Sequence, residues 1–279
     1  MMRRLTRMLR GTGRGAAEPF PGTLAVAGRP VSAIRLLGGY HRPGITKAGR
    51  LSLRGTCDGA AVKVYSAHSA AQVRLRRALQ DISLPGGICL PEIVASDDTL
   101  VAERWVEGTP LGDLRGRALS DAAEQVRRFL HGCAAAPDLQ ALAGRFDGAF
   151  CYLENYLLPR LGDWVHVCEI GGFVAHWRNA YAAVQPRLPR RLSHPDLSLA
   201  NLILEKGSGR LFIVDNELLG VGGGWLLDWH NSLLRDREIP PLDPPPAEFA
   251  AFVDLTWRLR RLGSALDAGD FRRALQTIA

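Results

Sequence analysis

The pattern of hydrophobic positions changes from strand-like to helix-like at about residue 110. In the first part, apolar residues run continuously or alternate with polar ones over short segments that glycine and proline interrupt, which is typical of β-strands. The dipeptide Asp58-Gly59 is typical of hairpin turns and separates two of these segments. The pattern predicts strands at 31–37, 51–54, 60–65, 92–95 and 100–106 and a helix at 70–79.

Helical spacing dominates the second part of the chain, where apolar residues recur every three or four positions. Two short apolar segments, 202–204 and 211–214, predict a β-hairpin because glycine-containing turn residues separate them. The glycine-rich segment 220–225 lacks the dinucleotide-binding pattern, and we expect a flexible connector there. The predicted helices cover 119–135, 145–160, 163–184, 247–262 and 264–278.

These elements predict an α+β protein of two lobes. A small antiparallel β-rich lobe is expected at 30–105. A hinge at 106–110 joins it to a larger, mostly helical lobe at 111–279, and residues 1–29 form a basic tail before the first lobe.

The composition of the 279-residue chain is that of a globular protein. Hydrophobic residues make up 47% and charged residues 23%, which argues against a disordered or collagen-like chain. No segment approaches the ~20 consecutive apolar residues of a membrane-spanning helix. The five cysteines are scattered and odd in number, so the sequence favours a reducing compartment, the cytoplasm, over a disulfide framework.

Positive charge is concentrated at the N-terminus. The formal net charge is +7, but five arginines precede the first acidic residue, Glu18, so the rest of the chain carries only +2. A nucleic-acid partner is therefore not expected, because it would need basic residues clustered on the folded body. Residues 1–10 place methionine and leucine on one helical face, which fits weak contact with the inner face of a membrane. A solvated leader is the alternative.

The segment 193–215 carries the residues most informative about chemistry. Asp196 and Asn201 lie five positions apart, just before the first strand of the predicted hairpin, and Asp215 follows the second strand. Folding the hairpin brings Asn201 and Asp215 to one end, near Asp196. Oxygen ligands of this kind suit Mg²⁺. Phosphoryl transfer needs such a metal site together with a carboxylate that takes the hydroxyl proton.

Lys63 is a second candidate for phosphate chemistry. It lies between two valines in the predicted strand 60–65, and the chain has only three lysines among its 35 basic residues. Phosphoryl transfer uses a strand lysine to hold the phosphates. Taken alone, a strand lysine more commonly faces solvent, and aspartate and asparagine are common in turns. The interpretation therefore depends on the order and spacing of these residues together.

The order of a strand lysine, a hinge, helices, His-x-Asp-x-x-x-x-Asn and a hairpin aspartate resembles the aminoglycoside phosphotransferase and choline kinase family over residues 30–265. The resemblance implies a two-lobed protein-kinase-like fold and transfer of the γ-phosphate of ATP to a hydroxyl group. It implies that Asp196 is the catalytic carboxylate, that Asn201 and Asp215 bind Mg²⁺, and that Lys63 contacts the α- and β-phosphates.

The resemblance also assigns supporting roles. His194 would brace the catalytic loop through hydrogen bonds, and Asp228 matches a family aspartate that supports the same loop. Glu217 follows Asp215 by two positions, as a family glutamate often does, and its role stays open. The implied hinge, whose backbone would meet the adenine of ATP, includes Glu103, Trp105 and Val106.

Three positions depart from the family pattern. Gln72 stands where relatives carry the helix glutamate that pairs with the strand lysine, and a glutamine offers a hydrogen bond without a charge. Ser198 stands where relatives often carry histidine or lysine near the moving phosphate. The loop 38–44 lacks the protein-kinase glycine pattern. We expect a working enzyme, with a nucleotide-binding or scaffolding pseudo-kinase as the alternative.

The charge of the helical lobe bears on the acceptor. Residues 106–190 hold nine acidic residues and nine arginines, whereas a polycationic aminoglycoside is expected to meet an acidic surface. A hydroxyl-bearing sugar, amino alcohol or lipid-linked glycan such as lipopolysaccharide core is therefore favoured over an aminoglycoside. A protein acceptor is less expected, because no recognisable substrate-positioning segment follows Asp215.

Overall fold

The computed structural model describes residues 23–37, 52–228 and 246–279. Most of the expected N-terminal tail and the whole loop 38–44 lie outside the described residues. At the described end of the expected tail, Leu24–Val26 forms strand β1. No helix in the described part of the chain has the length and apolar character needed to cross a membrane.

The chain divides into two compact units. The first comprises Met1–Phe129 and Ser198–Glu217, and the second comprises Leu130–Leu197 and Leu218–Ala279, each as far as its residues are described. The division does not follow the expected hinge at 106–110. The physical reason is that β7 (Gly108–Pro110) pairs with the later hairpin and keeps both segments in the first unit.

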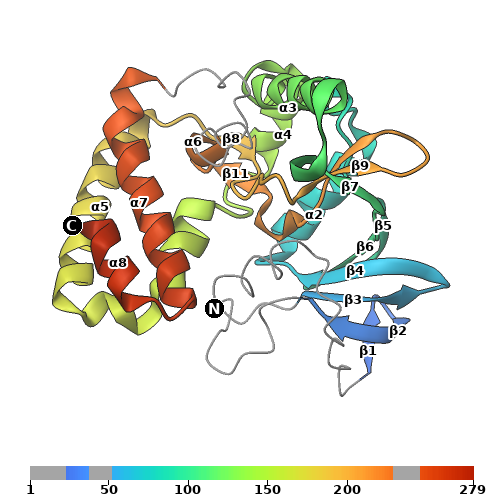
Figure 1. Cartoon of the computed structure of the whole chain (residues 1–279), viewed down its shortest axis with the longest axis horizontal. Helices are drawn as coiled ribbons and strands as arrows, with labels where there is room; N and C mark the ends of the chain where they lie inside the picture. Colours follow the sequence, from blue (N-terminus) through green and yellow to red (C-terminus); the bar gives the residue numbers. More distant parts are fainter. Residues whose placement is uncertain (1–22, 38–51, 229–245) are drawn as a thin grey trace. The chain divides into compact units, whose positions relative to one another are not determined.

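A six-stranded antiparallel sheet forms the body of the first unit (Figure 1). Asp58 and Gly59 both have positive φ angles, 49° and 79°, at the turn between β3 and β4, as expected for a tight hairpin. The strand order is β1-β2-β3-β4-β6-β5. Besides β1, the strands of this sheet are β2 (Arg29–Leu36), β3 (Ser52–Cys57), β4 (Ala60–Ser66), β5 (Ile93–Ser96) and β6 (Leu100–Arg104).

Helix α2 (Ala70–Ala78) packs against this sheet through an apolar cluster of Tyr65, Val73 and Val101. The helix begins after Ser69, whose hydroxyl accepts a hydrogen bond from the backbone N–H of Gln72 and satisfies a donor of the first turn. The cap therefore sets where α2 begins, and the apolar cluster is one of the contacts that hold it on the sheet.

The first unit also contains a three-stranded sheet of order β10-β9-β7. The predicted hairpin is confirmed, with β9 (Leu202–Glu205) pairing antiparallel to β10 (Leu211–Ile213). Gly108 in β7 lies so close to β9 that a Cβ atom there would lie 2.1 Å from the carbonyl oxygen of Leu204. Glycine is therefore required where β7 meets the hairpin.

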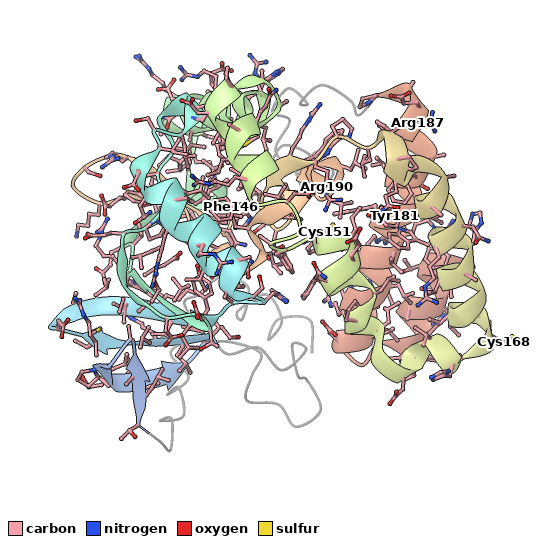
Figure 2. The ribbon with its side chains drawn as sticks, turned by 180° about the vertical axis from the view of Figure 1, so that it is seen from behind. Phe146, Cys151, Cys168, Tyr181, Arg187 and Arg190 are labelled. Atoms are coloured by element: carbon pink, nitrogen blue, oxygen red, sulfur yellow. The ribbon has the colours of Figure 1, made fainter. Side chains whose placement is uncertain are left out.

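Helices form most of the second unit (Figures 1 and 2). Their core surrounds Trp177, which is fully buried and donates from its indole nitrogen to the Thr256 hydroxyl at 2.9 Å. The helix α3 (Gly116–Ala135) begins in the first unit and ends in the second. The other helices are α4 (Pro137–Arg145), α5 (Cys168–Val184), α6 (Trp225–Asp228), α7 (Ala250–Asp267) and α8 (Phe271–Ile278).

Two predictions for the second unit are wrong. No continuous α-helix covers 145–160, because the chain turns at Gly148 with a φ of 78° and continues as a short π-helix, Leu153–Leu157. The expected connector 220–225 is instead partly a strand, since β11 (Gly220–Gly222) pairs with β8 (Arg191–Ser193) and is buried. A Cβ atom on Gly220 would lie 2.3 Å from a backbone oxygen, so close packing explains its glycine.

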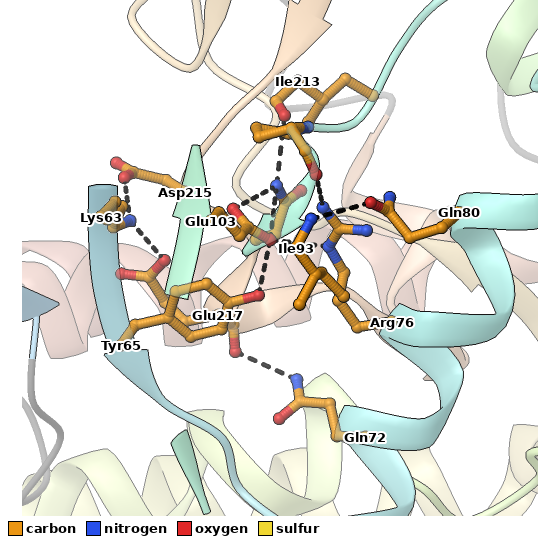
Figure 3. A network of polar contacts seen from close by, with 12 residues as sticks. Lys63, Tyr65, Gln72, Arg76, Gln80, Ile93, Glu103, Ile213, Asp215 and Glu217 are labelled. Carbon is orange, nitrogen blue, oxygen red and sulfur yellow. Dashed lines mark hydrogen bonds and ion pairs between the residues drawn. The ribbon is translucent and has the colours of Figure 1, made fainter. Parts of the chain in front are cut away.

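A buried ion pair joins α2 to the sheet in the first unit. Arg76 donates to a carboxylate oxygen of Glu103 at 2.6 Å, and both side chains are no more than 3% exposed. The same carboxylate accepts a hydrogen bond from the Tyr65 hydroxyl at 2.8 Å (Figure 3). It also accepts one from the Asn216 amide at 3.2 Å. Arg76 also donates to the carbonyl oxygen of Pro91. The charges are therefore paired and hydrogen-bonded, as burial requires.

Replacing Arg76 with leucine is expected to lower the free energy of unfolding by about 3–5 kcal/mol, because it leaves the Glu103 carboxylate buried without its counter-charge. Urea denaturation followed by circular dichroism measures the loss. The matched control is Arg117→Leu, which removes an arginine from an exposed pair with Asp121 and is expected to cost less than about 1 kcal/mol. Equal losses in the two variants would contradict the structural role of the buried pair.

Candidate active site

The hairpin β9–β10 brings Asn201 and Asp215 together at one end, as the sequence predicts. Leu202 pairs with Ile213 in the hairpin register, and the N–H of Val214 donates to the carbonyl oxygen of Asn201 at 2.8 Å. Asn201 is a buried residue, whereas 46% of the Asp215 side chain is exposed. Asn201 and Asp215 therefore lie at the same end of the hairpin, with Asp215 one residue beyond the backbone partner of Asn201.

Asp215 has an unusual backbone conformation, with a φ of 60°. L-residues other than glycine rarely adopt this left-handed region, and they do so where surrounding contacts hold them there. Here the contacts are an ion pair with Lys63 and the hydrogen bonds of the next residue, Asn216, to Glu103 and to the carbonyl oxygen of Ile213 at 3.2 Å. These contacts therefore hold the backbone that carries the Asp215 carboxylate.

Lys63 lies in the middle of β4 with only 7% of its side chain exposed. The ammonium group donates to the Asp215 carboxylate and to Glu217 Oε2, the latter at 2.7 Å (Figure 3). Burial alone lowers the pKa of Lys63, but the charges and hydrogen bonds of Asp215 and Glu217 outweigh it and raise the pKa above its ordinary value of 10.5. Lys63 therefore does not face solvent, although a strand lysine taken alone would be expected to do so.

Gln72 contacts the backbone of Glu217. Its side-chain Nε2 donates to the carbonyl oxygen of Glu217 at 3.1 Å, and its Oε1 accepts from the N–H of His68 at 2.8 Å. The carboxylate that pairs with Lys63 next to Asp215 comes from Glu217 and not from α2. The sequence identified both residues as notable but did not relate them, because they are 145 positions apart.

The residues of the expected hinge have several roles. Glu103 pairs through its backbone with both neighbouring strands, and its side chain belongs to the buried ion pair with Arg76. The N–H of Trp105 donates to the carbonyl oxygen of Ala61 at 2.8 Å. Val106 packs in an apolar cluster with Cys89 and Phe212. Glu103 thus has a structural role, and contact of this segment with adenine stays a prediction.

Asp196 lies in the second unit, in the turn after β8. The turn is closed by a hydrogen bond from the N–H of Leu197 to the carbonyl oxygen of His194 at 2.9 Å, and His194 is fully buried. Arg260 of α7 donates to Asp196 Oδ1 at 2.5 Å and also to the carbonyl oxygen of Pro195. Two hydrogen bonds from one guanidinium therefore hold the carboxylate and the loop that carries it.

Arg260 is a site residue that the sequence did not reveal. Its guanidinium is largely buried, with ring centroids of Trp257 at 5.6 Å and Tyr152 at 5.9 Å. Burial lowers the pKa of Arg260, but the neighbouring Tyr152 and Asp196 raise it above its ordinary value. The only sequence signal is a run of arginines in a C-terminal helix, and helical spacing does not show which of them turns toward a loop 64 positions earlier.

Ser198 and Asp228 are the remaining predicted site residues. Ser198 begins the segment that returns to the first unit, and its carbonyl oxygen accepts from the N–H of Asn201 at 3.0 Å. Asp228 is the last residue of α6. The convergence of Asp196 with Asn201 and Asp215 and the supporting role of Asp228 stay predictions.

The donor set around Lys63 fits a divalent cation. Asp215 and Glu217 carry two negative charges against the one positive charge of Lys63, and Asn201 lies at the same end of the hairpin as Asp215. In the described residues no group of three or more histidine, cysteine, aspartate or glutamate side chains is arranged to hold a metal ion. Mg²⁺ commonly uses one or two carboxylates together with substrate phosphates and water, so this smaller set suits it.

Comparison with solved structures identifies the fold. No protein-family model matches the chain, and no curated protein matches it. The aminoglycoside phosphotransferase APH(4)-Ia, as a thermostable mutant with ADP and hygromycin B, is 16% identical with a TM-score of 0.52, over 89% of this chain and 91% of that one. Aminoglycoside 2'-phosphotransferase-IIIa in its GDP complex is 16% identical with a TM-score of 0.51, over 99% of this chain and 95% of that one.

Choline kinase LicA from Streptococcus pneumoniae is also similar. It is 15% identical with a TM-score of 0.52, over 89% of this chain and 93% of that one. The chain therefore has the α+β, protein-kinase-like fold of aminoglycoside phosphotransferases and choline kinase, as its sequence predicts.

Replacing Lys63 with methionine tests the buried ion pairs through their pH dependence. Because the folded-state pKa of Lys63 lies above 10.5, the unfolded chain loses this proton first as the pH rises. The stabilisation from the ammonium is thus complete below about pH 10.5 and falls above it, by up to about 1.4 kcal/mol per pH unit. The stability difference between the wild type and Lys63→Met, measured by denaturation with a chelator present, is expected to fall in that window.

The control for this measurement is Lys206→Met, because Lys206 is exposed in the turn between β9 and β10. Its stability relative to the wild type is expected to stay constant over the same pH range. A constant difference for Lys63→Met as well would show that the ammonium group is not paired in the folded chain.

Proposed function

We propose that the chain is a phosphotransferase that uses ATP and Mg²⁺ and moves the γ-phosphate to a hydroxyl group of a small molecule or glycan. The observation that carries the proposal is the buried ammonium of Lys63, which is held between Asp215 and Glu217 at the end of the hairpin that also carries Asn201. A buried cation beside an oxygen donor set is what binding of a metal–triphosphate requires.

The residues of the first unit bind the nucleotide in this proposal. Lys63 donates to the α- and β-phosphates. Asn201 and Asp215 supply amide and carboxylate oxygens to Mg²⁺, which when bound neutralises charge on the phosphates. The fixed backbone of Asp215 supports this role, because a rigid ligand does not have to be ordered when the metal binds.

Asp196 acts on the acceptor. Its carboxylate accepts the proton of the attacking hydroxyl, and it is held by an ion pair with Arg260. The hydrogen bonds from Arg260 also fix the direction of the carboxylate. In this proposal His194 braces the loop from its buried position.

A pseudo-kinase is the second candidate function. It is favoured by Ser198, because a serine adds no positive charge where relatives often carry one. The glutamine at position 72, where relatives carry a glutamate, is weaker support for a pseudo-kinase, because Glu217 supplies the carboxylate partner of Lys63. Nucleotide binding without phosphate transfer would identify this alternative.

The acceptor is proposed to be a sugar, an amino alcohol or a lipid-linked glycan. The equal numbers of acidic residues and arginines in 106–190 support this, because they provide no excess of acid for a polycation. In the second unit, the partly buried acidic side chains of Asp196 and Asp267 are both paired with arginines, Arg260 and Arg160. An antibiotic acceptor, such as the hygromycin B bound in the APH(4)-Ia structure, is thus the less favoured case.

Replacing Asp196 with asparagine is expected to lower turnover by about 10²- to 10⁴-fold, because the hydroxyl proton then has no acceptor. Binding of Mg·ATP is expected to stay within about twofold of the wild type, since Asp196 contacts the acceptor and not the nucleotide. Coupled ADP release and a thermal-shift titration measure the two quantities. The control is Asp138→Asn on the exposed face of α4, which should leave both unchanged. Full turnover by Asp196→Asn would show that Asp196 is not the proton acceptor.

A screen of hydroxyl acceptors by ADP release tests the acceptor class. Neutral and anionic sugars, amino alcohols and lipopolysaccharide core are expected to raise ADP release well above the acceptor-free rate. Hygromycin B and gentamicin are expected to raise it least. Faster turnover of these aminoglycosides than of every other acceptor would contradict the charge argument.

A further inference from the structure

Two carboxylates contact Lys63, and they differ in their surroundings. Glu217 is 13% exposed, whereas Asp215 is 46% exposed. An enclosed carboxylate next to a buried ammonium has little freedom to leave it, because separating the pair would strand both charges away from water. An exposed carboxylate can exchange the ammonium for a cation from solution at much lower cost.

We propose that Glu217 is the permanent counter-ion that positions Lys63, which frees Asp215 to bind the metal, and that Gln72 of α2 acts as a positioning residue by holding Glu217. This inference rests on the proposed function. It accounts for Gln72 at the helix position where the sequence lacks an acid, because the acid that pairs with Lys63 is supplied by the loop after β10.

The loop that carries Glu217 is held by contacts of Asn216 and of the Glu217 backbone. Before it, the amide of Asn216 donates to the buried carboxylate of Glu103 and to the carbonyl oxygen of Ile213, each at 3.2 Å. At Glu217 itself, the carbonyl oxygen accepts from Gln72 Nε2 at 3.1 Å. The backbone that carries the Glu217 side chain is therefore held by contacts with β6 and α2, and Figure 3 shows the contact of Gln72 with Glu217.

The contacts of Gln72 explain why an amide is suitable there. One end of the side chain faces a donor, the N–H of His68 at 2.8 Å, and the other faces an acceptor, the carbonyl oxygen of Glu217. Glutamine offers one acceptor and one donor, whereas an ionised glutamate offers acceptors only. A glutamate at position 72 would thus oppose the carbonyl oxygen that Gln72 now binds.

The test compares Glu217→Gln with Asp215→Asn, because each variant removes one of the two charges from Lys63 without changing side-chain size. Glu217→Gln is expected to weaken binding of metal-free ADP and to lower kcat/KM for ATP by about tenfold to a hundredfold, since the phosphate-binding ammonium is misplaced. The Mg²⁺ concentration for half-maximal activity is expected to stay unchanged. Asp215→Asn is expected to raise that Mg²⁺ requirement and to leave binding of metal-free ADP nearly intact.

A second measurement follows Lys63 without nucleotide. The chain has only three lysines, so modification by trinitrobenzenesulfonate can be followed at Lys63 by peptide mass spectrometry, with the exposed Lys206 as internal reference. Glu217→Gln is expected to speed modification of Lys63 severalfold, and more than Asp215→Asn does. The matched control is Glu124→Gln on α3, which should change neither readout because Glu124 pairs only with exposed arginines in the described structure.

A double-mutant cycle tests the role of Gln72. Gln72→Leu alone is expected to change ADP binding and Lys63 modification in the same direction as Glu217→Gln, but less. In the Glu217→Gln background it is expected to add nothing, because its effect passes through the Glu217 carboxylate. Additive losses in the cycle would show that Gln72 acts only on stability and would overturn its positioning role.

The outcomes separate this inference from the proposed function. If Glu217→Gln shifts the Mg²⁺ requirement and leaves metal-free ADP binding and Lys63 modification unchanged, Glu217 is a metal ligand and the inference is wrong. If the wild type binds no nucleotide and transfers no phosphate, the proposed function fails, and the modification rates still decide whether Glu217 holds Lys63.

Discussion

The first unit depends on one constraint, which is that the ammonium group of Lys63 is enclosed in protein and needs counter-charges close to it. Both come from residues 152 and 154 positions later in the chain, Asp215 and Glu217. The central strand of the large sheet and the end of the small hairpin are therefore joined by charge. A chain that formed the sheet without the hairpin would leave a buried cation unpaired.

A second buried ion pair, Arg76 with Glu103, gives this junction its rigidity. Asn216 lies between Asp215 and Glu217 in sequence and donates to the Glu103 carboxylate, so the loop that carries the counter-charges is anchored to the pair that fixes α2. In the second unit, Arg260 and Asp196 show the same principle on a loop after a short strand. In each case a conformation is held by a charged hydrogen bond to a partner remote in sequence.

Much of the fold follows from local pattern. The turn at Asp58-Gly59 and the hairpin β9–β10 form where predicted, because turn residues and apolar alternation act over a few positions. The predictions for 145–160 and 220–225 fail for a different reason. Helix α4 ends at Arg145 and the chain turns at Gly148. The glycines of β11 allow close packing against Phe150 and Cys151 and do not form a flexible connector. Such packing leaves no periodic signal in the sequence.

By itself, the sequence determined the strand that carries Lys63, the hairpin that joins Asn201 to Asp215, and the order of residues that predicts a phosphotransferase fold. Only the tertiary structure decided that Lys63 is buried, that Glu217 pairs with it while Gln72 holds the Glu217 backbone, and that Arg260 holds Asp196. The reason is that turns and strands arise from neighbouring residues, whereas the partner of a buried charge is chosen by which distant segments meet in the folded chain.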